Sequence, residues 1–521
     1  MRRNLLTRLT AMVLAAVAIA ACTTQPKMEE YANVIPSDAT MLIGMNCQQL
    51  GNKSGITADD PLMQRITDSM KEGIDAATVK DLEVILNDPT KSGLDVAAPM
   101  YVYTQENATQ TLVNFVAKVQ NEQALQKLLE TLSKEGICTA PQKADGFSFA
   151  TIQQDAVIAY NGSTMLIRTV DGNMEQVKQE ITAQLKQTAE QSIVSTEGFK
   201  KLRAMEGDVE CLVVYDKFFE QVFKSANIPV EQLSQMPVMQ RLMNNYKDAQ
   251  MMSAICLDDG KISLKYDLTT TNPQTQAFLD ENSASLTPLK NKFLKNFPQS
   301  SPLLFSFGVD GVKFYDSMMS QIELFPAEAK SYMQTDVTQK ICSLFKGDVT
   351  FGITDIPMGL PTFLLLAEVT DAAPLNSLVV DIPGVQKEKE NEYSYTYMGM
   401  FTFYFGIRDN VLYATDDSKL CADLNKAVDS SMEKSSYLAK MKGSHSILAI
   451  NAETLTASPL IKMAIQQGGQ EAALIMTLVN KMSYLTACSE KMSGEGILYM
   501  KDTQTNVLKQ FVDWGKSLAG M

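Results

Sequence analysis

One succession of strand-like and helix-like segments occurs twice along the sequence, and this repetition constrains the fold more than any other feature. Residues 36–290 and residues 301–521 each begin with an apolar stretch, at 39–45 and at 301–307. Each half continues with a helical stretch, two strand-like segments, a helix, a long hairpin, a polar helix, a further strand and a closing hairpin. Because a repeated order of segments is typical of duplicated units, we predict two similar halves.

Short runs of alternating or continuous apolar residues mark the predicted strands. In the first half they lie at 39–45, 100–103, 111–116, 147–149, 156–160, 164–167, 209–215, 251–256 and 262–268. In the second half they lie at 301–307, 349–353, 363–367, 393–397, 401–405, 411–413, 446–450, 484–488 and 496–500. Paired strands separated by single helices predict an α+β fold, with an antiparallel sheet in each half and helices packed on one face of it.

The main predicted helices lie at 62–70, 122–132, 174–185, 312–319, 374–380, 418–428 and 506–518. A linker at 291–300, in which Pro298 interrupts the apolar pattern, separates the halves. Asn161-Gly162 joins two predicted strands, and we expect a tight hairpin turn with positive φ at both residues. Asp409-Asn410 occupies the corresponding place in the second half.

Residues 1–21 have the organisation of a signal peptide. Arg2, Arg3 and Arg8 are followed by an apolar run at 9–21. A permanent membrane helix needs roughly 20 apolar residues, so this shorter run indicates a targeting segment that is removed from the mature protein.

Small residues lead up to Cys22, as in the sites that signal peptidase II recognises. We predict cleavage between Ala21 and Cys22, lipid on the Cys22 thiol, and a flexible tether at 22–35. Two or three acyl chains are enough for stable membrane anchoring. No aspartate follows Cys22 directly, which favours the outer membrane. The folded part of the protein could face the periplasm or the cell surface, and the sequence leaves both alternatives open. A further alternative is an ordinary secretory signal peptide that is followed by a cysteine by chance.

The mature chain is long enough for two or more domains, and 45% hydrophobic residues is a globular composition. Without residues 1–21 it carries 43 basic and 60 acidic side chains, a net charge of −17. Such a charge repels nucleic acid, so we expect no nucleic-acid partner.

Seven cysteines remain besides Cys22, an odd number at wide spacing and without a C-x-x-C pair. Several lie inside apolar runs, so we predict small buried hydrophobic side chains rather than disulfides. These residues are Cys47, Cys138, Cys211, Cys256, Cys342, Cys421 and Cys488.

The sequence contains a single histidine, His445, which excludes a site with several histidine ligands. We expect His445 in a surface loop. No nucleophile elbow, phosphate-binding loop or dinucleotide-binding glycine pattern occurs. With 60 acidic residues a pair of catalytic carboxylates stays possible, but no pair can be selected. We therefore predict no catalytic residue, no cofactor and no metal site.

Aromatic residues are the remaining candidates for ligand binding. The single tryptophan, Trp514, lies on a predicted helix, where packing is the favoured interpretation. Tyr393, Tyr395 and Tyr397, followed by Phe401, Phe403 and Phe405, recur at every second position and so share one face of each strand. These two sets fit either a sheet face buried under helices or an exposed platform for sugars.

Two sequence segments resemble those of a known protein family. They are the segment from Tyr31 to Thr40, which contains Ile35-Pro36-Ser37-Asp38-Ala39, and Lys91-Ser-Gly93-Leu-Asp95 before a strand. Together with the residues around Cys22 they resemble a Bacteroidota lipoprotein family that is known only as a domain of unknown function. The resemblance covers nearly the whole mature chain and implies no active site.

The sequence therefore predicts a membrane-anchored envelope lipoprotein that binds a partner or acts as an assembly scaffold without catalysing a reaction. Its expected partners are the membrane, through the lipid on Cys22, and a protein or glycan. The alternatives are a hydrolase that acts on glycan or peptide through carboxylates, and a glycan-binding lipoprotein.

Overall fold

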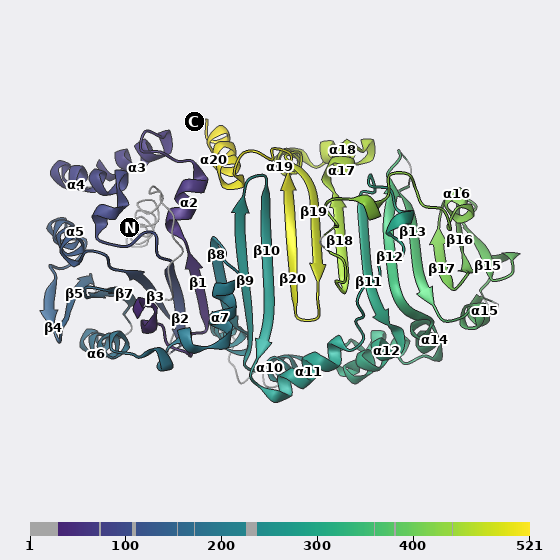
Figure 1. Cartoon of the computed structure of the whole chain (residues 1–521), viewed down its shortest axis with the longest axis horizontal. Coiled ribbons are helices and arrows are strands. Elements are labelled where there is room, and N and C mark those ends of the chain that lie inside the picture. The colour runs from purple at the N-terminus through teal and green to yellow at the C-terminus, as the bar shows by residue number, and fades with distance from the viewer. Residues whose placement is uncertain are drawn as a thin grey trace. The chain divides into compact units, whose positions relative to one another are not determined.

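The computed structural model describes residues 30–520, except 72–73, 107–110, 154, 171, 226–236, 359, 380–381 and 440. The chain forms two compact units, whose elements are labelled in Figure 1. Unit 1 comprises Met1–Gln235, Tyr246–Thr270 and Gln504–Met521, and unit 2 comprises Met236–Asn245 and Thr271–Thr503. These units differ from the predicted halves, because residues 271–300 belong to unit 2 and the C-terminal helix belongs to unit 1.

Ten strands of unit 1 form an antiparallel sheet. Their order across the sheet is β4 (Gln142–Ala144), β5 (Phe147–Ile152), β6 (Ala156–Tyr160), β7 (Thr164–Thr169), β3 (Thr111–Lys118), β2 (Met100–Glu106), β1 (Met41–Met45), β8 (Val209–Val214), β9 (Ala249–Asp258) and β10 (Lys261–Thr270). The first strand in the sequence thus lies inside the sheet, between β2 and β8.

Unit 2 has the same order of strands, with every number raised by ten. It runs β14 (Val385–Lys389), β15 (Glu392–Tyr397), β16 (Phe401–Arg408), β17 (Val411–Thr415), β13 (Thr362–Val369), β12 (Phe345–Asp355), β11 (Leu303–Asp310), β18 (Ser446–Asn451), β19 (Met482–Ser489) and β20 (Ser493–Met500). All these pairings are antiparallel, so the α+β prediction is confirmed. The shared order supports the prediction of two similar halves, which superposition of the units would test.

The helices of unit 1 include α2 (Cys47–Ser54), α3 (Pro61–Lys71), α4 (Ala76–Asn87), α5 (Glu122–Lys134), α6 (Met174–Leu185), α7 (Glu197–Ala204), α8 (Tyr215–Ser225) and α20 (Val507–Leu518). Those of unit 2 include α10 (Pro237–Asn245), α11 (Pro273–Ser283), α12 (Gly311–Ser320), α13 (Ala327–Met333), α14 (Asp336–Leu344), α15 (Ala373–Val379), α16 (Ser418–Ala422), α17 (Ala452–Ala457), α18 (Pro459–Gln467) and α19 (Gly469–Val479). No helix of the described residues is long and apolar enough to span a membrane.

Asparagine side chains explain where several helices begin. Asn121 Oδ1 accepts from Ala124 N at 3.0 Å before α5, and Asn173 Oδ1 accepts from Glu175 N at 2.9 Å before α6. Such caps satisfy backbone N–H groups that lack a partner in the first turn.

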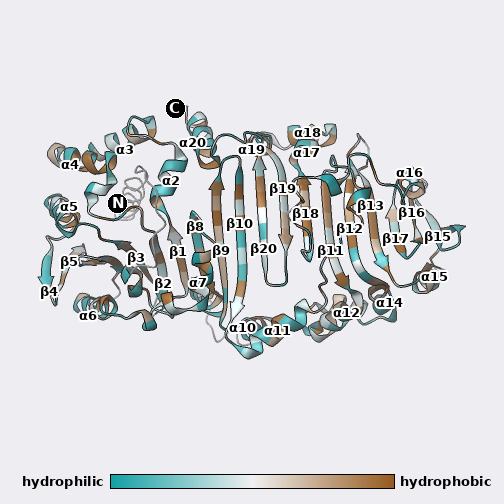
Figure 2. Ribbon diagram, viewed as in Figure 1, coloured by the Kyte–Doolittle hydropathy of each residue, from teal (hydrophilic) through white to brown (hydrophobic). Residues whose placement is uncertain are grey.

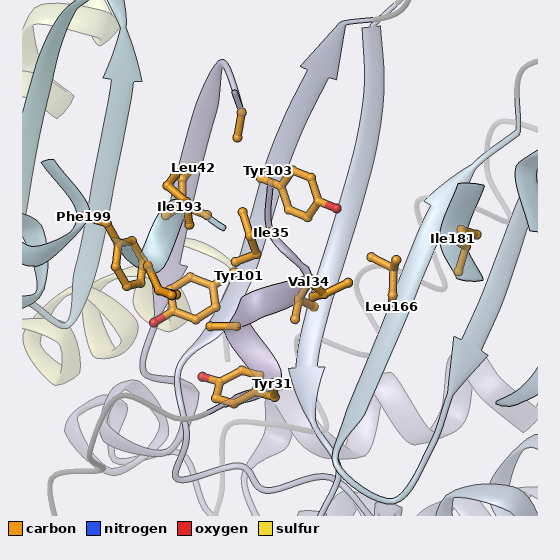
Figure 3. Close-up of a cluster of buried hydrophobic side chains, with 14 of the residues drawn as sticks. Tyr31, Val34, Ile35, Leu42, Tyr101, Tyr103, Leu166, Ile181, Ile193 and Phe199 are labelled. Atoms are coloured by element: carbon orange, nitrogen blue, oxygen red, sulfur yellow. The ribbon is translucent and has the colours of Figure 1, made fainter. Parts of the chain in front are cut away.

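The sheet of unit 1 is covered on both faces. Val116 and Leu166 belong to one core, which Ile181 of α6 and Phe199 of α7 complete (Figure 3). The neighbouring residues Ala117 and Met165 belong to a second core under α5 on the opposite face. Because both sets of alternating side chains are apolar, helices cover two faces rather than the single face that we predicted.

The core of unit 1 begins earlier in the chain than the predicted tether allows. Tyr31, Val34 and Ile35 are buried, and Tyr31 lies close to Tyr101 with ring centroids 6.1 Å apart (Figure 3). The Tyr31 hydroxyl donates to Pro99 O at 2.6 Å. The predicted tether at 22–35 therefore does not extend beyond the first residue of the 3-10 helix Glu30–Val34.

One face of the unit 2 sheet is covered by irregular segments more than by helices. Leu304 and Leu364 pack with Phe293 and Phe297 before β11 and with Met432 between α16 and β18. The predicted helix at 418–428 ends at Ala422. It stops early because later carbonyls, including Leu424 O, accept from Asn296 Nδ2 at 2.7 Å instead of continuing the helix.

The two hairpins with expected tight turns differ. Asp409 and Asn410 have positive φ values of 51° and 59°. Asn161 and Gly162 are not among the residues with positive φ, which corrects the expectation for this turn. Asn161 Oδ1 accepts from Ser163 N at 2.9 Å and Thr164 N at 2.8 Å, so the side chain stabilises a different turn.

Candidate functional site

A row of phenylalanines crosses the second face of the unit 2 sheet. Phe305 of β11 lies opposite Phe351 of β12, and Phe351 neighbours Phe363 of β13 with ring centroids 6.2 Å apart. Phe363 in turn neighbours Phe403 of β16 at 6.1 Å. We call these four residues, together with Phe307 (5.4 Å from Phe305), the aromatic row. Strands distant in the sequence thus combine five aromatic rings on one face.

Phe305 shows that the middle of this face is open. Its strand is flanked by β12 and β18, where Phe351 and Leu448 lie directly opposite. The Phe305 side chain is nevertheless 40% exposed. A central residue of a ten-stranded sheet keeps such exposure only where no second layer packs on it. Among the described residues, apolar contacts on this face gather at one end, where Leu344 of α14 packs near Val369 and Ile407.

In Figure 1, α12 and α14 lie at one end of β11–β13, and α17 and α18 lie at the other. Figure 2 shows apolar residues recurring along the same strands. These helices thus lie near the strand ends, which agrees with the exposure of Phe305 in the middle of the face.

The predicted tyrosine and phenylalanine sets extend the same face. Tyr393 pairs with Phe405, with ring centroids 5.8 Å apart, and Tyr397 pairs with Phe401. Tyr393 is buried and Tyr397 is 46% exposed. Tyr393 therefore fits the interpretation of a buried sheet face, and Tyr397 fits the interpretation of an exposed one. The sequence predicted the hairpin of β16 and β17, but it did not predict the pairing of β17 with β13.

Polar groups are scarce on the open face. In the register around Phe305, the same face carries Leu365, Ala414 and Leu448. At one end Ser446 and Ser489 face each other, and their hydroxyls are hydrogen-bonded at 2.6 Å. These hydroxyls are partners of one another, so the face around Phe305 offers apolar contact and few free hydrogen-bonding groups.

Unit 1 lacks this aromatic character at the corresponding places in its strand pairing. Ile43 of β1 lies opposite Val102 of β2, which lies opposite Phe115 of β3. Val113 lies on the same face and is 44% exposed. The aromatic row is therefore a property of unit 2 and not of the shared strand order.

Buried carboxylates in unit 1 pair with cations from neighbouring elements. Glu210 of β8 binds Arg203 of α7, and Asp208 accepts from Lys53 Nζ at 2.6 Å. Burial raises the pKa of Glu210, and the opposing charge and hydrogen bond of Arg203 only partly offset this. These pairs connect helices to the sheet, which is a structural role.

A similar arrangement fixes the segment before β11 in unit 2. Glu368 of β13 accepts from Lys290 Nζ at 3.2 Å and from Lys292 Nζ at 3.0 Å. Asp348 of β12 accepts from the backbone N–H groups of the same two lysines at 3.0 and 2.9 Å. Burial raises the pKa of Glu368, but the hydrogen bonds from Lys292, Asp348 N and Lys290 outweigh it, and the net shift is downward.

The backbone of His445 forms hydrogen bonds with residues of two strands, β19 and β11. Its N–H donates to Ser489 O at 2.7 Å, and its carbonyl accepts from Gly308 N at 2.9 Å. Burial, and then the charge of Lys491, lowers the pKa of the imidazole. Among the described residues, no hydrogen bond joins its ring to a serine, cysteine or carboxylate.

Other predicted positions have structural surroundings. Trp514 is half-buried on α20, which packs near α2 and β9 in unit 1. None of the seven described cysteines forms a disulfide; Cys47 and Cys138 are buried and the other five are half-buried. Among the described residues no group of three or more His, Cys, Asp or Glu could hold a metal ion. Ala21 and Cys22 lie outside the described residues.

A hollow of about 330 Å³ in unit 2 lies between Asn296 and residues 423–429. Its polar groups bind one another: Lys426 Nζ contacts Asp423 at 2.6 Å, and Asn296 donates to backbone carbonyls. The aromatic row is therefore the stronger candidate for ligand binding.

No curated protein matches the chain. The solved structure described as crystal form I of TP0453 is 12% identical, over 51% of this chain and 90% of that chain, with a TM-score of 0.26. Crystal form IV of TP0453 is 11% identical, over 46% and 81%, with a TM-score of 0.25. A family described as a domain of unknown function, DUF4836, matches residues 31–508, and the chain belongs to this family.

Proposed function

We propose that the protein is a non-enzymatic envelope lipoprotein, anchored to the outer membrane through Cys22, that binds an acyl chain on the aromatic row of unit 2. The exposure of Phe305 in the middle of β11 is the observation that carries the proposal. An apolar sheet face left open to water is costly, and covering it with an apolar ligand recovers roughly 25 cal/mol per Å².

An acyl chain suits the surface better than a sugar does. Sugars need hydrogen-bonding partners beside a stacking ring, whereas Phe305 is surrounded on this face by Leu365, Ala414 and Leu448, and the nearby serine hydroxyls bind each other. The centroids of Phe351, Phe363 and Phe403 follow one another at 6.2 and 6.1 Å. With the width of the rings, this row is comparable to one acyl chain, which spans about half of the roughly 30 Å bilayer core.

The ion pairs argue against catalysis by three buried carboxylates. Glu210, Asp208 and Glu368 each face a lysine or arginine that connects two elements. A carboxylate held in this way is poorly placed to exchange a proton with a substrate. The rival proposal, a carboxylate hydrolase, requires an acidic pair free of such partners in a cleft.

The test uses residues 22–521 with Cys22→Ser and a fatty acid that carries a fluorescent group. We expect saturable binding, and at least about a tenfold loss of affinity in Phe305→Ser, because an apolar contact of this size is worth more than 1.4 kcal/mol. Val113→Ser is the matched control, since Val113 is an exposed apolar residue on the corresponding face of unit 1. Equal affinity of both variants, or binding of glycans but not fatty acid, would overturn the proposal.

A further inference from the structure

Two hairpin turns of unit 2 expose large apolar side chains to water. Met358 and Leu360, between β12 and β13, are 66% and 53% exposed. Met398 and Met400, between β15 and β16, are 71% and 67% exposed. Single exposed apolar residues are common, but four at such exposure on two turns are not needed to cover any core.

The strand pairing brings these turns to one end of the sheet. β13 and β16 both pair antiparallel with β17, so they run in the same direction. The turns that lead into them, before Thr362 and before Phe401, therefore lie at the same end. Tyr397, which is 46% exposed, adds an aromatic ring to the second turn.

Helices α18 and α19 add apolar side chains at that end. They follow β18, whose last residue lies beside the first residues of β11. Ser458 Oγ, at the corner between α17 and α18, donates to Ile356 O of the β12–β13 turn at 3.3 Å. Met463, Leu474 and Ile475 on these helices are exposed.

The opposite end of the sheet has a different composition. The β16–β17 turn there contains Asp409 and Asn410, and the β19–β20 turn contains Glu490 and Lys491. By contrast, residues 356–363 and 395–407 contain no charged residue, although 20% of the chain is charged. The hairpin turns at the two ends thus differ, polar at one end and apolar at the other, although α12 and α13 expose Val312, Phe314 and Tyr332 beside the polar turns.

We infer that the apolar end of unit 2 is a membrane-contact edge, at which Met358, Leu360, Met398 and Met400 insert into the interfacial region of a lipid bilayer. Separate tips that carry long flexible side chains suit a deformable medium, whereas a protein partner needs a continuous complementary surface. The proposed anchor at Cys22 would keep this edge within reach of a membrane. Because the protein is acidic, insertion must be apolar and not electrostatic.

The test is flotation of residues 22–521, carrying Cys22→Ser, with vesicles of phosphatidylethanolamine and phosphatidylcholine. We expect the protein to float with the vesicles, and added salt to leave the bound fraction unchanged. The double variant Met398→Asp/Met400→Asp should lower the partition coefficient at least about tenfold. The matched control is Val312→Asp/Tyr332→Asp, which charges two exposed apolar positions on α12 and α13, 54% and 74% exposed.

A second variant reports insertion directly. With Trp514→Phe removing the single tryptophan, Met398→Trp places the only indole at the tip. Its emission should shift to the blue on addition of vesicles and be quenched by brominated acyl chains. No flotation, an unshifted emission, or equal losses in both double variants would overturn the inference. Loss of fatty-acid binding in Phe305→Ser with flotation retained would separate this edge from the proposed ligand site.

Discussion

Arg408 holds Glu392 through two parallel hydrogen bonds, from Nε to Oε1 and from Nη2 to Oε2, each 2.9 Å long. Arg408 Nη1 also donates to Cys421 O at 3.1 Å, which ties α16 to strands β15 and β16. The hydrogen bonds from Arg408 hold the pKa of Glu392 below its ordinary value. This planar pair therefore fixes the aromatic strands at the sheet end opposite the apolar turns.

We predict that Glu392→Gln lowers the free energy of unfolding by about 2 kcal/mol at pH 7, since a hydrogen bond to a charged group is lost. Because the folded-state pKa is depressed, the contribution is complete above the ordinary carboxyl pKa near 4.3 and disappears as the pH falls through the folded-state value. Urea unfolding at pH 7 and at successively lower pH measures this. The exposed control Glu328→Gln should stay within about 0.5 kcal/mol, and a pH-independent difference for Glu392→Gln would contradict the assignment.

Tyr31 should be essential to unit 1 although it lies in a stretch that looks like a tether. Tyr31→Ala removes a buried ring and its hydrogen bond to Pro99 O, so we expect a loss of about 3 kcal/mol or more. Tyr332→Ala, at a position 74% exposed, should change stability by less than about 0.5 kcal/mol. Thermal unfolding followed by circular dichroism compares the two; similar midpoints would mean that the N-terminal segment is not part of the core.

The surroundings of Gly93 explain why the segment Lys91-Ser-Gly93-Leu-Asp95 contains a glycine. Its φ is +85°, and a Cβ there would lie 2.4 Å from Leu125 N and 2.5 Å from Asn121 O, at the start of α5. Gly136 also has positive φ, with open space around it. We predict that Gly136→Ala costs about 1 kcal/mol, and that Gly93→Ala costs about 1–3 kcal/mol more because of the clash. Equal chemical denaturation midpoints would contradict this.

Cys47 and Cys138 should resist alkylation in the folded protein. Burial raises the pKa of Cys47 to about 12 and that of Cys138 to about 11, which leaves little thiolate at pH 8. We expect iodoacetamide to label the half-buried Cys256 faster than either residue, and all seven thiols to react after denaturation. Peptide mass spectrometry over time measures the order, and rapid labelling of Cys47 in the native state would contradict the packing of α2.

Strands were the most predictable part of the fold. The predicted segments at 156–160 and 209–215 coincide with β6 and β8 within one residue, since short runs of alternating or continuous apolar residues mostly form strands. Helix 174–185 was placed correctly because Asn173 caps an amphipathic stretch. Helix 418–428 was too long because Asn296, more than 120 residues earlier, competes for its carbonyl groups.

The candidate site depended on pairing that a linear pattern does not contain. The aromatic residues at 393–405 were recognisable in the sequence as two sets, each on one face of a strand. Phe305, Phe351 and Phe363 belong to separate segments, and only the strand order brings them beside Phe403. Whether a sheet face is open depends on which helices pack on it. This packing is a feature of the tertiary structure and cannot be read from the local sequence pattern.

The assignment of Gln504–Met521 to unit 1 has a consequence for the order of assembly. Asn506 Nδ2 donates to Leu257 O at 2.9 Å, and Lys516 pairs with Asp60. A nascent chain that has reached residue 503 contains every strand of both sheets, yet it still lacks the helix that closes one side of the first. Residues beyond 503 therefore return to unit 1, which was synthesised first, and a truncation after residue 503 would harm unit 1 rather than unit 2.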